Sequence, residues 1–221
     1  MYDFPSSAVK RLRRLDCCAV SDALDRLKLP GVVTDIPLRS GASRIAGQVT
    51  TLKLGTGEPL LGPTVHLGCT AIEASGADNV IVIEQRTGVE AACWGGLLSL
   101  GAKIRGVAGI VADGPVRDID EAIMYQLSVF ARSLTCFTAR GRIVEKGTNV
   151  PINISGVAVN PGDYMLADSS GIVFLPKDKV EEILEIAEMV VVKEAAMAKG
   201  ILSGTPISQI MGKNYEHMLK G

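Results

Sequence analysis

Aromatic residues and histidine are scarce in this chain of 221 residues. Aromatic side chains make up 4% of the sequence, and only two histidines are present. Nucleic-acid surfaces use basic stripes and aromatic stacking platforms. Here the 23 Lys and Arg residues are balanced by 24 Asp and Glu, and no basic stripe is formed. We therefore expect no nucleic-acid partner.

Paired cysteine motifs and long apolar runs are also missing. The five cysteines are an odd number without C-x-x-C spacing, which favours reduced thiols over disulfides or a structural zinc. The apolar run at residues 189–192 is far too short to span a bilayer. The first residues carry Asp3 and then a basic cluster in place of an apolar signal core. We therefore expect a cytoplasmic protein without a membrane segment.

Helix-like and strand-like segments alternate through the middle of the chain. The runs at residues 79–84 and 107–112 are continuously apolar and rich in β-branched residues, as in buried strands. Further strands are predicted at residues 45–54, 129–131, 150–154, 157–159, 164–167 and 172–175, and helices at residues 6–15, 66–75, 97–103, 119–127 and 177–200. A short helix capped by Ser21 or Asp22 is predicted to end at Leu27.

No repeat, linker or low-complexity tract separates these segments. The sequence therefore predicts a single α/β domain over residues 1–221, a layered sandwich built on a mixed sheet. It has a helical N-terminal arm and a long C-terminal helix.

The most informative stretch is residues 94–118, WGGLLSLGAKIRGVAGIVADGPVRD. Gly95 and Gly96 open a helix, so a ligand can approach the backbone closely and meet the free amides of the first turn. A buried strand follows, and Asp113 begins a Gly-Pro turn that is expected to end it. That turn presents Arg117 and Asp118 at the carboxyl end of the strand, where ligands bind in open α/β sheets.

The Arg-Asp pair has two interpretations on spacing alone. Asp118 can cap the following helix, with Glu121 as its capping-box partner, while Arg117 forms a surface ion pair. Alternatively, Arg117 grips a carboxylate with its planar fork of donors, and Asp118 binds magnesium, which takes its other ligands from water and substrate. Asp113 is either a second acid of the same pocket or a turn former.

The chain resembles the RraA-like family, also described as class II pyruvate aldolases. That family includes 4-hydroxy-4-methyl-2-oxoglutarate aldolase, the regulator of ribonuclease E activity A and demethylmenaquinone methyltransferase-like proteins. The resemblance covers nearly the whole chain: SDALDRL near the start, the central block quoted above, VFARSLT, and VPINISGVAVNPGDYMLADSSGIVFLP late in the sequence. It implies a swivelling β/β/α fold, assembled as a homotrimer or hexamer with active sites between subunits.

The resemblance also implies a ligand set. Asp118 would bind Mg²⁺ or Mn²⁺, and Arg117 would hold the oxygens of a small 2-keto acid. The substrate carboxylate would be bound by the backbone amides of Gly95, Gly96, Leu97 and Leu98.

One departure from the family pattern concerns the acidic residue that positions a metal-bound water. Aldolase members have an acidic residue, twenty positions, then Arg-Asp, and the acid that positions the metal-bound water is replaced here by Gly96. Glu194 on the last helix of a neighbouring subunit is a candidate acid in its place, and Asp113 and Glu194 are the candidates for residues that support the site from behind the metal ligands.

The implied activity is a metal-dependent lyase reaction that leaves pyruvate enolate, either aldol cleavage of a 4-hydroxy-2-oxo diacid or oxaloacetate decarboxylation. The alternative is a non-catalytic regulator that acts by protein contact, like the ribonuclease E inhibitor. Methyl transfer is not expected, because no glycine-rich nucleotide loop follows the first strand.

Overall fold

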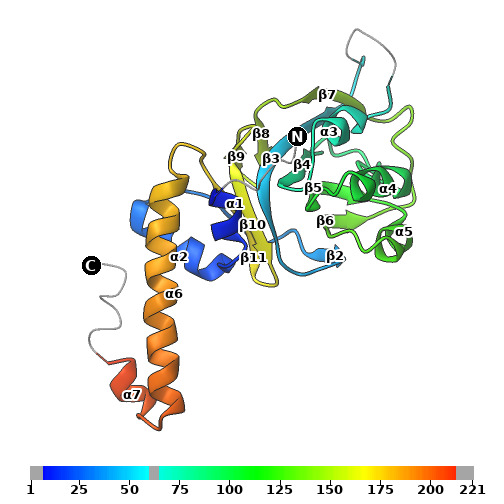
Figure 1. The fold of residues 1–221 in the computed structure, drawn as a ribbon. Helices are drawn as coiled ribbons and strands as arrows, with labels where there is room; N and C mark the ends of the chain where they lie inside the picture. Colours follow the sequence, from blue (N-terminus) through cyan, green and yellow to red (C-terminus); the bar gives the residue numbers. More distant parts are fainter. Residues whose placement is uncertain (1–6, 60–64, 213–221) are drawn as a thin grey trace.

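The computed structural model describes residues 7–59 and 65–212, and it is built around one large mixed sheet (Figure 1). The strands of this sheet are β1 (Val32–Val33), β2 (Leu38–Ser40), β3 (Ile45–Gly55), β4 (Asn79–Glu84), β5 (Gly109–Val116), β6 (Val129–Leu134), β7 (Val144–Thr148), β10 (Tyr164–Asp168) and β11 (Gly171–Leu175). Their order is β1-β11-β10-β3-β4-β5-β6-β2, with β7 paired to β3. The four central strands, β3 to β6, run parallel.

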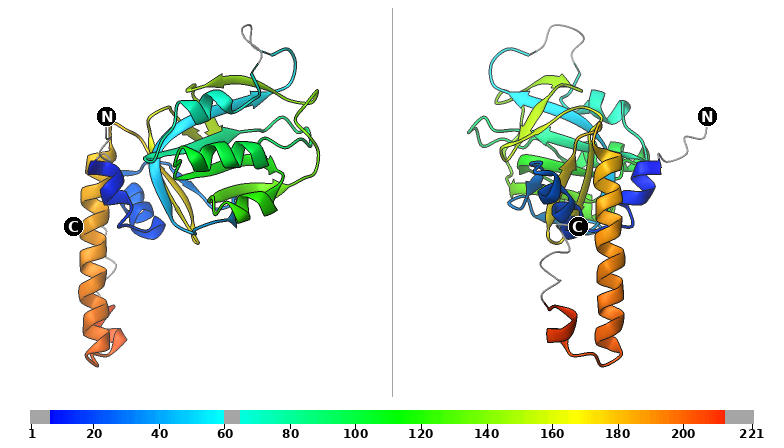
Figure 2. Two further views of the ribbon diagram at one scale, coloured as in Figure 1. Left: turned by 45° about the vertical axis from the view of Figure 1, so that its right-hand side comes forward. Right: turned by 90° about the vertical axis from the view of Figure 1, so that its left-hand side faces the viewer.

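The remaining elements are helices and one hairpin, most of which pack against this sheet. They are α1 (Ser7–Leu12), α2 (Cys17–Leu27), α3 (Cys69–Glu73), α4 (Gly96–Ile104), α5 (Ile119–Met124), α6 (Val180–Leu202), α7 (Ile207–Ile210) and the antiparallel pair β8 (Ile152–Ile154) and β9 (Val157–Val159). Figure 2 shows α3, α4 and α5 side by side on one face, while α1 and α2 gather with α6 at the other end of the molecule. The layered mixed-sheet α/β fold predicted from the sequence is confirmed.

The central strands are apolar throughout because both of their faces are covered. Ile81 and Ile83 of β4 pack in the cluster beneath α3 to α5, whereas Val80 and Val82 pack in the cluster that includes the β8–β9 hairpin. All four side chains are fully buried. Alternation of successive side chains between the two faces of a strand produces this pattern.

A third apolar cluster attaches the helical arm to the sheet. It joins α1, α2 and the first half of α6 to Leu166 of β10 and to Val173 and Leu175 of β11. Arg11 of α1 strengthens the same junction, since its guanidinium lies 2.7 Å from Glu188 and 2.6 Å from Glu181 of α6. The rest of α6 projects beyond the body, and α7 folds back beside its end (Figure 1).

Two local predictions were wrong, and several short elements were missed. The second helix begins at Cys17 with Asp16 as its N-cap, whose carboxylate accepts from Ala19 N at 2.9 Å, so neither Ser21 nor Asp22 is the cap. β5 does not stop at the Asp-Gly-Pro sequence but continues to Val116. Its pairing with β6 shifts register between Ala112 and Pro115, and such an irregularity accommodates a proline within a sheet. Strands β1, β2 and β7 and the short helix α7 were not predicted at all.

Among the residues that the structure describes, none of the helices combines the length and the apolar composition that a membrane-spanning segment requires.

Candidate functional site

The turn between β5 and α5 brings Asp118 to the start of a different helix. Asp118 adopts a left-handed backbone conformation with φ of 56°, and its side chain makes no capping hydrogen bond to α5. Its Oδ2 instead accepts from Gly96 N at 3.1 Å and lies 3.2 Å from Arg117 Nε. The capping interpretation of Asp118 for its own helix is therefore wrong, because the left-handed turn directs the carboxylate toward α4.

The N-terminus of α4 is open to a ligand. Gly95 is its N-cap and has no side chain to satisfy the first-turn amides, so the amides of Leu97 and Leu98 have no partner within the helix. The unsatisfied N–H groups carry partial positive charge that favours an anion. Within the chain, Asp118 supplies part of that negative charge by binding Gly96.

Glu121 fills the space above Gly96. A Cβ atom built on Gly96 would collide with the carboxylate of Glu121, one turn along α5 from Asp118. Gly95 is similarly crowded, since a Cβ there would lie 3.0 Å from Asp118 Oδ2 and 3.4 Å from Arg117 Nε. The two glycines are therefore needed for close approach: they let two carboxylates and a guanidinium reach the backbone.

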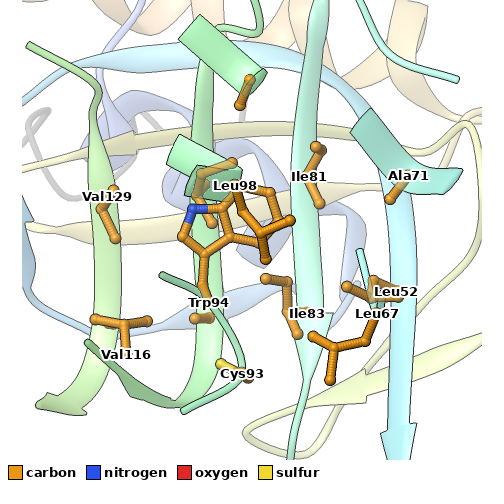
Figure 3. Close-up of a cluster of buried hydrophobic side chains, with 14 of the residues drawn as sticks. Leu52, Leu67, Ala71, Ile81, Ile83, Cys93, Trp94, Leu98, Val116 and Val129 are labelled. Atoms are coloured by element: carbon orange, nitrogen blue, oxygen red, sulfur yellow. The ribbon is translucent and has the colours of Figure 1, made fainter. Parts of the chain in front are cut away.

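Buried hydrogen bonds fix the loop that carries these glycines. The indole of Trp94 donates to Ser99 Oγ at 3.0 Å, and Ser99 donates to the carbonyl of Gly95, also at 3.0 Å. Arg117 N donates to the Trp94 carbonyl at 3.0 Å and ties the end of β5 to the loop. Figure 3 shows Trp94 in the apolar cluster with Leu98, near Ile81 and Ile83 of β4. These hydrogen bonds and apolar contacts hold the glycine loop in place.

A cavity of about 720 Å³ adjoins the N-terminus of α4. Its lining includes every residue assigned to the metal or the substrate by resemblance: Gly95, Gly96, Leu97, Leu98, Arg117 and Asp118. Arg117 and Asp118 keep 39% and 36% of their side-chain surface exposed, so both are accessible from the cavity.

Asp113 lies outside this cavity and has other partners. It is fully buried, and its carboxylate is 2.6 Å from Arg132 Nε and 3.3 Å from Arg86 Nη1. It also accepts from Ser155 N at 2.8 Å, at the turn of the β8–β9 hairpin. These contacts hold the hairpin on the sheet and include no contact with Asp118.

Glu194 also does not line the cavity of its own chain. It lies on α6, where burial raises the pKa of its carboxyl group and the nearby Asp16 and Asp22 raise it further. A role at the site therefore requires a neighbouring subunit and stays a prediction.

The residue that sequence reasoning missed as a site residue is Glu121. It was considered only as a capping-box partner, but the structure places it beside Asp118 at Gly96. The available signal was its position three residues after Asp118, but spacing alone does not show that α5 is placed against Gly96. His66 and Arg140 also line the cavity. Cys93 lies behind the loop, where burial raises the pKa of its thiol to about 12, so it is an unreactive core residue.

Comparisons with known proteins agree on the family. The family model for RraA-like proteins, described as Aldolase/RraA, matches residues 17–174. A Halalkalibacterium halodurans protein named "Putative 4-hydroxy-4-methyl-2-oxoglutarate aldolase" is 29% identical over 180 residues, which cover 81% of each protein. Protein DlpA of Legionella pneumophila is 26% identical over 94% of this chain, and the chain spans about a third (34%) of its length.

Solved structures share the fold. An uncharacterized protein from Pseudomonas syringae pv. tomato matches with a TM-score of 0.82 and 28% identity over 96% of this chain and all (100%) of the other. Streptomyces coelicolor RraAS2, described as an unusual member of the RNase ES inhibitor RraA family, matches with a TM-score of 0.73 and 23% identity over 85% of this chain and 94% of its own. The chain therefore belongs to the Aldolase/RraA family of RraA-like proteins.

Proposed function

We propose that the chain is a divalent-metal-dependent lyase that breaks a carbon–carbon bond in small 2-oxo acids. The observation that carries this proposal is the convergence of Asp118, Glu121 and Arg117 on the open N-terminus of α4. Relatives with aldolase names support an enzyme family. Aldol cleavage of 4-hydroxy-2-oxo diacids and decarboxylation of oxaloacetate are the two reactions to test first.

The donor set fits a hydrated magnesium or manganese ion. Asp118 Oδ1 and the Glu121 carboxylate make no hydrogen bond to any residue that the structure describes, so hard oxygen ligands are available. The same part of the chain holds no group of three or more potential metal-ligating side chains, which favours an ion that takes its other ligands from water and substrate. Such an ion would act as a Lewis acid toward the 2-oxo oxygen.

The chain's own groups bind and orient the substrate. The amides of Leu97 and Leu98 donate to its carboxylate at the positive end of α4. Arg117 uses Nε for Asp118, so its remaining N–H groups are free to donate to the 2-oxo oxygen. These donors stabilise the negative charge that moves onto that oxygen when the bond between C3 and C4 breaks.

Glu121 is the acid best placed to handle the proton. In aldol cleavage the C4 hydroxyl loses its proton, C4 becomes a carbonyl carbon, and the electrons of the broken bond move through C3 to the 2-oxo oxygen. The Glu121 carboxylate accepts the hydroxyl proton, directly or through a water molecule that it positions, and the same proton is then delivered to C3 to give pyruvate. Positioning such a water is the role that the family assigns to the acid replaced here by Gly96.

Assembly is part of the proposal. A homotrimer or hexamer would place the cavity at a subunit boundary, where Glu194 of a neighbour could reach it. Exposed apolar side chains beside the site support such a contact, since Leu97 is 85% exposed and Met124 of α5 is 68% exposed. The same surface supports the second candidate, a regulator that acts by protein contact.

The test is pyruvate release from oxaloacetate and from a 4-hydroxy-2-oxo diacid with Mg²⁺ or Mn²⁺, measured above the rate of the metal alone. We expect EDTA to abolish activity and Glu121→Gln to lower kcat at least about a hundredfold. Asp120→Asn is the matched control, because Asp120 is an exposed acid in the same turn that does not line the cavity. Rates at background for both diacids, and also for a 4-hydroxy-2-oxo acid with an apolar end, would contradict the lyase proposal. Ribonuclease binding that persists in Arg117→Ala would favour the regulator.

A further inference from the structure

The cavity is much larger than the pyruvate moiety needs. Its volume of about 720 Å³ lies within the range of about 300–1,000 Å³ that encloses drug-sized ligands. The groups that would bind the 2-oxo acid all lie at one place, where the N-terminus of α4 meets α5. The remaining volume is large enough to accommodate another part of the ligand.

The lining on the α3 side of α4 is apolar. There Leu98 of α4 and Ile72 of α3 line the cavity with Leu67, Trp94 and Ala139, and all five belong to one apolar cluster. A Cβ built on Gly68 would lie 3.4 Å from the Trp94 ring and 3.5 Å from Leu98 Cδ1, so the segment before α3 closes against these side chains. We call the part of the cavity bounded by Leu67, Ile72, Trp94, Leu98 and Ala139 the apolar chamber.

Gly101 keeps this chamber open. It lies in the interior of α4, where glycine is less favourable than alanine, and it lines the cavity. Neither backbone strain nor crowding requires it. Its φ is not positive, and a Cβ there would lie 3.7 Å and 3.8 Å from the Ile72 methyl groups, which is ordinary contact. The missing side chain at Gly101 therefore leaves free volume between α4 and α3.

The charged residues at this end of the cavity lie at its rim. Glu73 and Arg140 are both exposed, whereas Leu67, Ile72, Leu98 and Ala139 are each less than a tenth exposed. A ligand group that enters the chamber loses contact with water and contacts apolar side chains instead. This transfer favours an apolar group over a carboxylate.

We propose that the substrate of this site is a 2-oxo acid whose far end is an apolar chain or ring bound in the apolar chamber, rather than a second carboxylate. This inference rests on the proposed function for the position of the 2-oxo acid end. It changes the expected substrate from a small diacid to a 2-oxo acid with an apolar substituent beyond C3, so a 4-hydroxy-2-oxo acid of that kind is the substrate to add to the pyruvate-release assay.

Trp94 provides the measurement. It is the only tryptophan in the chain, it is 2% exposed, and it lines the cavity. Its fluorescence can therefore report binding of unreactive straight-chain 2-oxo acids, from pyruvate to 2-oxooctanoate, in the presence of Mg²⁺. We expect Kd to fall about fourfold for each added methylene until the chamber is filled.

Two substitutions at Gly101 test where the apolar end of the ligand binds. Gly101→Leu should fill the chamber and remove the dependence on chain length, while an unchanged circular dichroism spectrum shows that the fold is intact. Gly101→Ala is the matched control, because its Cβ fits, and it should keep most of the chain-length dependence.

The outcomes separate this inference from the proposed function. A Kd that does not change with chain length would contradict binding of an apolar end in the chamber. Tighter binding of 2-oxoadipate than of 2-oxohexanoate, with that difference lost in Arg140→Ala, would contradict it as well. Metal-dependent pyruvate release would still support the lyase. Chain-length dependence without any lyase activity would keep the chamber and reject the lyase. Failure of every 2-oxo acid to bind would reject both.

Discussion

Asp113 and Asp118 lie five positions apart at the end of β5 and have opposite environments. Asp113 is fully buried and is held by two guanidinium groups and an amide. Asp118 is partly exposed and uses one oxygen for Gly96 and Arg117, which leaves the other without a partner in the described part of the chain. A carboxylate with all its partners supports the fold, whereas one with unused binding capacity at a helix N-terminus is available to a ligand.

The largest effect should come from removing the charge of Asp118. Asp118→Asn keeps a side chain that tolerates the left-handed conformation but weakens metal binding. We expect kcat/KM for pyruvate release to fall about a thousandfold or more, with a Tm change of less than about 2 °C. Steady-state kinetics and thermal unfolding check both values. A folded Asp118→Asn protein with normal activity would remove Asp118 from the mechanism.

Substitution of Asp113 should instead lower stability and leave activity nearly unchanged. Asp113→Asn leaves Arg132 without its shortest ion pair and should lower the free energy of unfolding by about 3 kcal/mol, because one partner of a buried pair is lost. Arg132 keeps Asp35, which limits the loss. Denaturant unfolding measures the change, and activity per folded molecule should stay within about threefold. A selective loss of activity would show that Asp113 acts at the site after all.

Substitutions at Gly96 and Glu121 should have an intermediate effect on activity. Gly96→Asp alone should reduce activity about tenfold or more, because the new side chain collides with Glu121 and adds a like charge. In Gly96→Asp combined with Glu121→Ala, the acid is supplied from α4 instead. We expect the double variant to be at least about tenfold more active than Glu121→Ala. Equal activities would mean that the two positions are not equivalent.

The smallest effect concerns acid stability around Arg132. Hydrogen bonds from Arg132 and Ser155 lower the pKa of Asp35. A lowered folded-state pKa stabilises the protein above the unfolded-state pKa of about 3.9, and this stabilisation is lost as pH falls through the folded-state value. Asp35→Asn should therefore flatten the decline of Tm between about pH 5 and pH 3. Asp120→Asn serves as the control, and an unchanged profile in Asp35→Asn would contradict the assignment.

Periodicity was enough to predict the central strands. The run at residues 79–84 was placed with its observed bounds, because a parallel strand buried on both faces is apolar at every position. The same reasoning ended β5 too early. Asp113 is a turn former by type, and the contacts of its carboxylate with the distant Arg86, Arg132 and Ser155 allow it to lie inside the sheet.

The sequence by itself determined the family-typical block, the glycine-opened helix and the adjacent Arg117 and Asp118, because these are local patterns of residue type and spacing. Only the tertiary structure decided that Asp118 serves α4 instead of its own helix, and that Glu121 occupies the space over Gly96. Both depend on how α5 is placed against α4. That placement is fixed by packing on the sheet and by the left-handed turn at Asp118, which spacing along the chain does not encode.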